Sequence, residues 1–164
     1  MNRIVNTMND NSTNNNVLAY QATRLKELIK EIQECCEERK IYEKNRFGLP
    51  YSDLECLQLF NGERYLTVKN ISQKLEVTKS RVTKIINDLL EKGMVERVDD
   101  PKDSRVKLIS LTPLGMKKSE EIDSFHKEIH GNILRLMNDA ERKEVISTLE
   151  LLRVSMESVK QNLV

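Results

Sequence analysis

The stretch from Leu66 to Gly93 constrains the fold more than any other part of the chain. It reads LTVKNISQKLEVTKSRVTKIINDLLEKG, in which two runs of helically spaced apolar residues are separated by Glu76 and Val77. Thr67 stands where the N-cap of the first helix belongs, and Thr78 does the same for the second. The inward faces would be formed by Val68, Ile71 and Leu75 and by Val82, Ile85, Ile86, Leu89 and Leu90. The pattern predicts two short helices joined by a tight turn.

The outward face of the second helix is polar along its length. Its side chains are Lys79, Ser80, Thr83, Lys84 and Asn87. Such cations, hydroxyls and amides reach phosphates or base edges, and no large apolar group interrupts them. Arg81 lies near the helix start, where it could read a guanine bidentately or clamp a phosphate. We expect this helix to contact the major groove of DNA, with Asn87 touching the backbone.

A β-hairpin is expected directly after the helix pair. Gly93 stands where the second helix must end, and the residues that follow alternate as strands do. The strands would run over 95–98 and 106–111, around the charged tip DDPKDSR. The fold class is therefore mainly α with a small β-hairpin wing, a winged helix-turn-helix flanked by further helices.

The same stretch resembles the DNA-binding core of the MarR family of bacterial transcriptional regulators. The similarity rests on the LT-x3-I-x3-L-x-VT-x-S-x-VT helix pair, the KG-x-V-x-R hinge and the D-x-R-x5-LT signature. The signature residues here are Asp103, Arg105, Leu111 and Thr112. The resemblance implies that Lys102 and Arg105 contact the minor groove or phosphates, with Asp103 holding Arg105 by an ion pair. It also implies a homodimer on a pseudo-palindromic operator, acting as a repressor and modulated by an effector.

Glu76 departs from the pattern, because this turn position is often Gly in such motifs. If the backbone needs a positive φ there, glutamate would cost roughly 1 kcal/mol relative to glycine. That cost is tolerable for the fold.

Helices are expected on both sides of this core. We predict a disordered Asn-rich leader over 1–16, N-terminal helices over 17–62 for dimerisation and core support, the winged helix-turn-helix over 63–112, and C-terminal dimerisation helices over 113–164. Pro113 suits the first turn of a long helix, and Asn138 with Glu141 approximates a capping box for the last one. The last helix carries a heptad-like apolar seam at Val145, Leu149, Leu152, Met156, Val159 and Leu163. Such a seam usually packs against another helix.

The distribution of charge supports a nucleic-acid interface in the middle of the chain. The net charge is only +1, but residues 63–107 carry 11 basic and 8 acidic side chains. Each flanking segment carries 8 basic and 9 acidic side chains. The positive excess thus falls in the candidate DNA-binding segment, and a dimer would double it.

Other classes of protein are less well supported. The sequence shows no glycine-rich phosphate loop, nucleophile elbow or HExxH motif, so we do not expect an enzyme. A helical adaptor for protein partners would be expected to show apolar anchors among residues 79–87, where the chain has hydroxyls and cations. No apolar run approaches roughly 18 residues, and no signal peptide is recognisable, so a cytoplasmic protein is expected.

Histidines and cysteines suggest possible effectors. His126 and His130 are spaced to project from one helical face, as two ligands of one metal ion do. Some zinc-sensing members of the resembled family use such a pair, which here would be completed by Cys56 in place of the expected histidine. Alternatively, the histidines flank a buried stripe, and Cys35, Cys36 and Cys56 are small buried hydrophobes or a redox switch. A small organic effector is the remaining interpretation.

Overall fold

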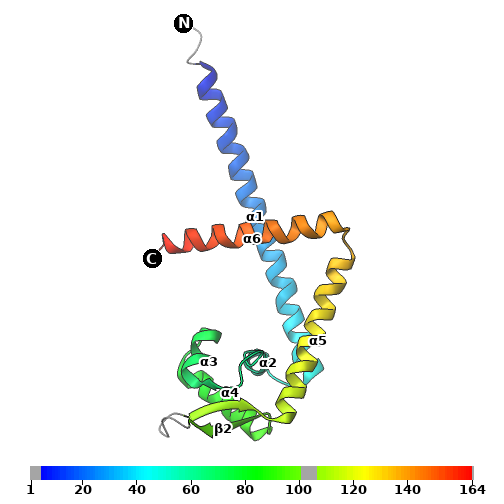
Figure 1. The fold of residues 1–164 in the computed structure, drawn as a ribbon. Coiled ribbons are helices and arrows are strands. Elements are labelled where there is room, and N and C mark those ends of the chain that lie inside the picture. The colour runs from blue at the N-terminus through cyan, green and yellow to red at the C-terminus, as the bar shows by residue number, and fades with distance from the viewer. Residues whose placement is uncertain (1–4, 101–106, 164) are drawn as a thin grey trace. The chain divides into compact units, whose positions relative to one another are not determined.

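The computed structural model describes residues 5–100 and 107–163 of the chain. The helices are α1 (Val5–Phe47), α2 (Tyr51–Gln58), α3 (Val68–Leu75), α4 (Lys79–Glu91), α5 (Pro113–Arg135) and α6 (Asp139–Gln161), shown in Figure 1. Strands β1 (Leu66–Thr67), β2 (Val95–Asp99) and β3 (Lys107–Leu111) form one small sheet. The chain divides into two compact units, residues 1–54 and 55–164. No helix within the described residues is long and apolar enough to cross a membrane.

Helix α1 is longer than the sequence predicts. It begins at Val5, so the backbone of residues 5–16, expected to be a disordered leader, is helical. Extending an existing helix costs far less than nucleating one, which allows polar residues to join it. Along the helix the apolar stripe is largely exposed, including Leu18, Leu25 and Ile32.

The helix pair forms as the sequence predicts. The Thr67 side chain accepts a hydrogen bond from Asn70 N and the Asn70 side chain accepts one from Thr67 N, which makes a capping box for α3. Glu76 ends α3 in the left-handed conformation, with φ 54°, and its N–H donates to Ser72 O. The Ser72 hydroxyl donates to Val77 O at 2.6 Å and braces the turn. The glutamate therefore occupies the positive-φ position that glycine more often fills.

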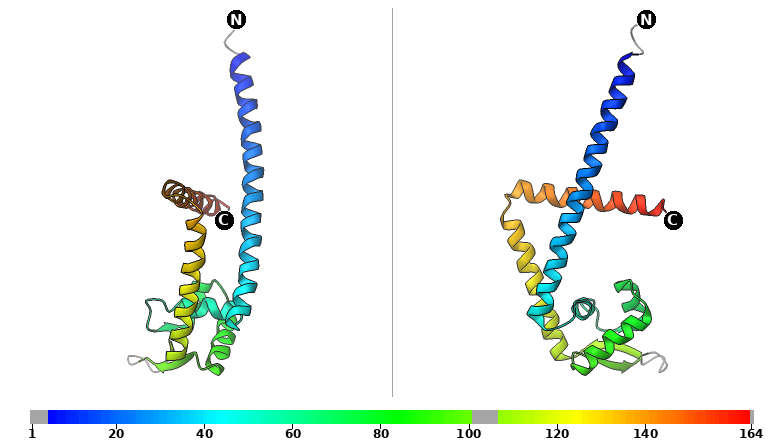
Figure 2. Two further views of the ribbon diagram at one scale, coloured as in Figure 1. Left: turned by 90° about the vertical axis from the view of Figure 1, so that its right-hand side faces the viewer. Right: turned by 180° about the vertical axis from the view of Figure 1, so that it is seen from behind.

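The wing has one more strand than expected. Strands β2 and β3 form the anticipated antiparallel hairpin, with Arg97 opposite Ile109 and Glu96 opposite Ser110. Strand β1 pairs with the other edge of β3, which gives the order β1-β3-β2. Leu66, Val95 and Ile109 are buried and join the sheet to the helices of its own unit. The two views in Figure 2 show α3, α4 and this sheet gathered together.

The C-terminal helices are capped at their starts, and of the two only α5, over residues 113–125, contributes buried residues. Pro113 occupies the first turn of α5, and Asn138 forms a capping box with Glu141 at the start of α6. The Arg142 guanidinium donates to Leu134 O at 2.7 Å, which ties the two helices at their corner. Within α5 Ile122 and Phe125 are buried, whereas Ile133 near its end is 48% exposed.

Candidate nucleic-acid interface

Helix α4 separates its apolar and polar side chains cleanly. Its Thr78 N-cap accepts a hydrogen bond from Arg81 N at 3.4 Å. The inward residues Val82, Ile85, Ile86 and Leu89 are buried, and Leu90 is half-buried. All the predicted α4 contact residues are exposed, namely Lys79, Ser80, Arg81, Thr83, Lys84 and Asn87. The fold thus gathers three cations with hydroxyl and amide groups on the solvent side of one helix.

Hydrogen bonds within the helix limit what its hydroxyls can offer a ligand. The Thr83 hydroxyl donates to Lys79 O at 2.9 Å, and the Ser80 hydroxyl lies 3.0 Å from that of Thr78. A threonine whose proton is used in this way presents acceptor lone pairs and a methyl group outward. Those are the groups that meet cytosine amino groups and thymine methyl groups in the major groove.

Arg97 belongs to the candidate interface, although the sequence analysis assigned it no contact. Its guanidinium donates to the Asn87 side-chain oxygen at 2.7 Å and so joins β2 to α4. Because its oxygen is engaged, Asn87 has its amide hydrogens left to donate. Strand alternation places Arg97 on the same face as Ile109, toward α4. This alternation in the sequence could have predicted that Arg97 faces α4. Arg97 thereby positions both the helix and the sheet of the interface.

The tip of the wing is only partly described. Lys107 pairs with Asp99 across the base of the hairpin. The predicted wing contacts Lys102, Asp103 and Arg105 lie outside the described residues.

Hydrogen bonds made by Thr112 join the hinge after α4 to the start of α5. The Thr112 hydroxyl donates to Gly93 O at 2.7 Å and accepts from Gly115 N at 3.1 Å, while Thr112 N donates to Met94 O. A Cβ added at Gly115 would lie 1.9 Å from Met94 O, so only glycine fits this approach. The threonine of the D-x-R-x5-LT signature therefore has a definite mechanical role. It ties the start of α5 to the hinge after α4.

A second junction holds α5 against the end of α2. The Gln58 amide donates to Ser119 O at 2.8 Å and to the Ser119 hydroxyl at 3.1 Å. That hydroxyl donates in turn to Leu57 O. Two elements far apart in the sequence are thus joined through one buried serine.

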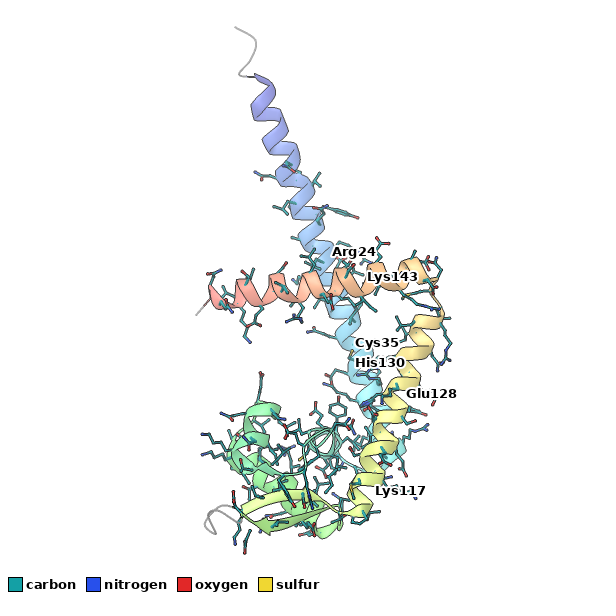
Figure 3. All side chains as sticks on the ribbon, in the orientation of Figure 1. Arg24, Cys35, Lys117, Glu128, His130 and Lys143 are labelled. Carbon is teal, nitrogen blue, oxygen red and sulfur yellow. The ribbon has the colours of Figure 1, made fainter. Side chains whose placement is uncertain are left out.

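The proposed metal ligands do not assemble into a complete set. His126 and His130 lie one turn apart on α5, with ring centroids 6.4 Å apart, and Figure 3 labels His130. Cys56 is fully buried. Across residues 5–100 and 107–163, no group of three or more His, Cys, Asp or Glu side chains could hold a metal ion. The structure therefore does not bring Cys56 together with the two histidines as ligands.

Two pKa shifts are found on helices other than α4. On α5, a hydrogen bond from Lys118 lowers the pKa of the Glu121 carboxyl. On α1, hydrogen bonds to Glu27 and then Glu31 raise the pKa of the Arg24 guanidinium. Both are surface effects and leave the charge of the α4 face unchanged.

Comparison with known proteins agrees with this geometry. The model of the MarR family matches residues 47–106. The repressor MdtR of Bacillus subtilis is 31% identical over 71% of this chain and 76% of its own length. The regulator PapX of Escherichia coli is 32% identical over 62% of this chain. That match covers 64% of PapX, so the chain spans less than two thirds of the length of this relative. The crystal structure of Streptococcus pneumoniae FabT with DNA superposes with a TM-score of 0.73 and 23% identity, covering 82% of this chain and 98% of FabT.

Proposed function

The chain belongs to the MarR family of DNA-binding transcriptional regulators, and on that premise we propose that it is a homodimeric repressor of a pseudo-palindromic operator. The observation that carries the proposal is the exposed polar face of α4 above a filled apolar core. MdtR, to which the chain is similar, is itself named a repressor. DNA as the ligand implies that the protein acts in the cytoplasm.

The DNA contacts would be divided between helix and wing. Lys79, Ser80, Arg81, Thr83, Lys84 and Asn87 would lie in or beside the major groove, and Lys102, Asp103 and Arg105 would serve the wing. Cations on phosphates supply affinity, while side chains on base edges supply sequence preference. Residues 63–112 are therefore the proposed DNA-binding core.

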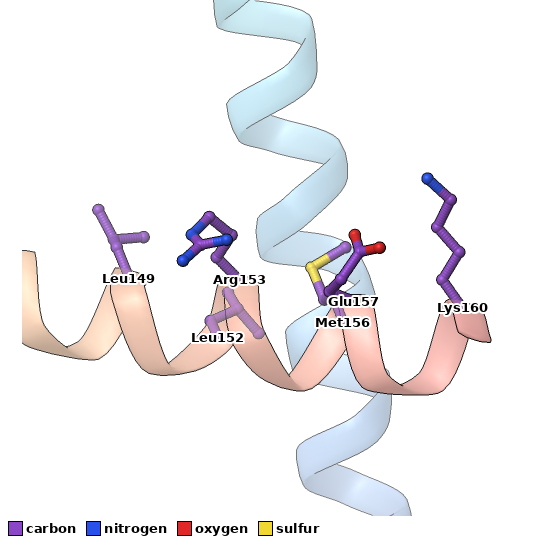
Figure 4. Close-up of a pocket in the computed structure, with 6 residues that line it drawn as sticks. All are labelled: Leu149, Leu152, Arg153, Met156, Glu157 and Lys160. Atoms are coloured by element: carbon purple, nitrogen blue, oxygen red, sulfur yellow. The ribbon is translucent and has the colours of Figure 1, made fainter. Parts of the chain in front are cut away.

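The remaining helices would form the dimer. Residues 17–62 and 113–164 include most of α1 and all of α5 and α6, whose exposed apolar side chains suit burial against a second copy. Figure 4 shows Leu149, Leu152 and Met156 projecting from α6. A two-fold dimer presents its recognition helices about one helical turn apart, so its operator is a near-palindrome.

Effector control would act through the spacing of the two recognition helices. Because α5 is locked to the hinge after α4, a ligand that shifts α5 changes how both helices fit the groove. A small organic molecule is the effector we favour. Zinc at His126 and His130, or oxidation of Cys35, Cys36 or Cys56, are alternatives within the same fold. A helical protein-interaction adaptor is disfavoured, because the outward face of α4 offers no large apolar anchor.

Fluorescence anisotropy on the duplex upstream of the protein's own gene tests DNA binding. We expect tight binding that weakens steeply as salt concentration rises. Arg81→Ala and Lys84→Ala should each weaken binding by about tenfold, equivalent to about 1.4 kcal/mol. Lys143→Ala, which removes an exposed cation from α6, is the matched control and should change little. Equal loss in all three variants would contradict the assignment of the α4 face.

The effector alternatives are separated by repeating the titration under three conditions. Metal-stripped protein is compared with protein given zinc, and with protein treated with a mild oxidant. A tenfold change with zinc, about 1.4 kcal/mol of coupling, that is lost in His126→Ala would identify a metal sensor. A change confined to the oxidant, and lost when the cysteines are replaced by serine, would identify a thiol switch. Identical affinity in all three conditions would leave an organic effector.

A further inference from the structure

A pocket of about 450 Å³ lies on the side of the wing sheet that faces away from α4. Side chains alternate between the two faces of a strand. Arg97 and its partner Ile109 face α4, as the bond from Arg97 to Asn87 shows. Glu96 and Ser110 are also paired across the strands, so they point from the opposite face. Both line this pocket, so two of its three sheet residues point away from the face that carries Arg97, and Leu111 at the end of β3 is the exception.

The walls come from three further segments of the same compact unit. The loop before β1 contributes Phe60 and Tyr65, the end of β3 contributes Leu111, and the first turns of α5 contribute Met116. Phe60 is buried, whereas Tyr65 is 38% exposed and Met116 is 47% exposed. Large apolar side chains that stay half in water around a hollow are typical of ligand sites.

The polar groups of the pocket favour a positive charge. Glu63 and Glu96 contribute two carboxylates against the one guanidinium of Arg64. The Ser110 hydroxyl donates to Glu96 Oε1 at 3.1 Å and holds that carboxylate over the sheet. A carboxylate offers about four acceptor positions, so this one bond leaves room for a charged donor.

Tyr65 is already paired with a cation of the chain itself. The Arg64 guanidinium carbon lies 5.2 Å from the centroid of the Tyr65 ring, within the range of a cation–π contact. Because the Arg64 guanidinium already lies over this ring, Tyr65 offers an occupant mainly apolar contact, and the preference for a positive charge rests on the carboxylates. Glu63 is partly neutralised by Lys74, 3.5 Å away, which makes Glu96 the principal anion.

We propose that this pocket, which we call the outer-sheet pocket, binds a small amphipathic organic cation. Its charged nitrogen donates to Glu96, and its apolar body lies against Phe60, Tyr65 and Met116. An occupant would bridge the loop before β1, the hairpin and the start of α5. If the proposed function holds, it would therefore restrain the wing relative to α5, but binding to the pocket does not depend on that function.

Three probes of similar size and different charge test the proposal on the full-length protein without DNA. Benzamidine is the cation, benzyl alcohol a neutral analogue of similar size and benzoate the anion, each titrated while backbone amide resonances are followed by NMR. We expect benzamidine to bind most tightly and to shift resonances of residues 60–65, 96, 110, 111 and 116. Benzoate binding as tightly as benzamidine, or shifts confined to other regions, would overturn the proposal.

Variants assign the charge preference to Glu96. Glu96→Gln should weaken benzamidine binding by about tenfold while leaving benzyl alcohol unaffected. Met116→Lys adds a cation at the pocket rim and should weaken benzamidine as well. Glu91→Gln removes an exposed carboxylate from the end of α4 and is the matched control. Unchanged benzamidine affinity in Glu96→Gln would refute the assignment, whether or not the protein binds DNA.

Discussion

The winged helix-turn-helix buries its apolar side chains, whereas helices α1 and α6 leave many of theirs exposed. Ile71, Val82 and Leu89 of the helix pair are 0% exposed within the single chain. Leu149 of α6 is 53% exposed and Leu18 of α1 is 63% exposed. Burying a large aliphatic side chain stabilises by about 1.5–3 kcal/mol, so the first region has gained this energy and the second has not. The DNA-binding core is complete in one copy, whereas the outer helices require apolar partners.

The largest effect is expected from a substitution that prevents α6 from packing against a second copy of the chain. Leu149→Glu should convert the proposed dimer to monomers, because a carboxylate would be buried in the interface. Operator affinity should then fall by about a hundredfold or more, since the two half-sites are no longer held by one molecule. Analytical ultracentrifugation and anisotropy measure the two effects. Ser147→Glu adds the same charge at another exposed α6 position and should alter neither, and a Leu149→Glu protein that remains dimeric would contradict the role of the seam.

A truncation inside the completed core should instead cost stability. Leu89→Ala removes a fully buried side chain and should lower the free energy of unfolding by about 2–5 kcal/mol, through lost burial and the remaining cavity. Leu151→Ala removes the same atoms from an α6 position that is outside the heptad-like seam and 68% exposed, and should change stability by less than about 0.5 kcal/mol. Denaturant titrations compare the two. Equal losses would show that the contrast between the regions is not real.

The junction between the winged helix-turn-helix and α5 can be disturbed with a single methyl group. In Gly115→Ala the new Cβ would lie 1.9 Å from Met94 O, so the start of α5 must move away from the hinge. We expect a loss of about 1–3 kcal/mol in the free energy of unfolding, as in other overpacked sites. Gly131→Ala, on the same helix, meets no atom closer than the Arg135 side chain at 3.4 Å and should be tolerated. Thermal unfolding would distinguish the two variants, and similar melting temperatures would contradict a tight α5 junction.

Local signals in the sequence predicted the core well because the interactions that form it are local. The caps Thr67, Thr78 and Asn138 depend on partners two or three residues away, and each is found. Contacts between segments far apart in the chain could not be predicted from local sequence patterns. The Gln58–Ser119 junction joins residues 61 positions apart, and strand β1 is too short to show alternation. The early start of α1 was missed because no cap marks it and its polar residues give no periodicity.

Glu76 is where local sequence and backbone conflict most directly in the completed core. Its φ of 54° lies in the left-handed region, which costs a residue with a side chain about 1–2 kcal/mol. Glu76→Gly removes this strain but adds freedom to the unfolded chain, so we expect a net stabilisation of less than about 1 kcal/mol. The hydrogen bond from the Ser72 hydroxyl to Val77 O should persist, because no atom of Glu76 takes part in it. Chemical denaturation measures the change, and Glu120→Gly, at an exposed position inside α5, is the control that should destabilise by about 1 kcal/mol. Destabilisation by Glu76→Gly would mean that the glutamate side chain contributes more than the strain it imposes.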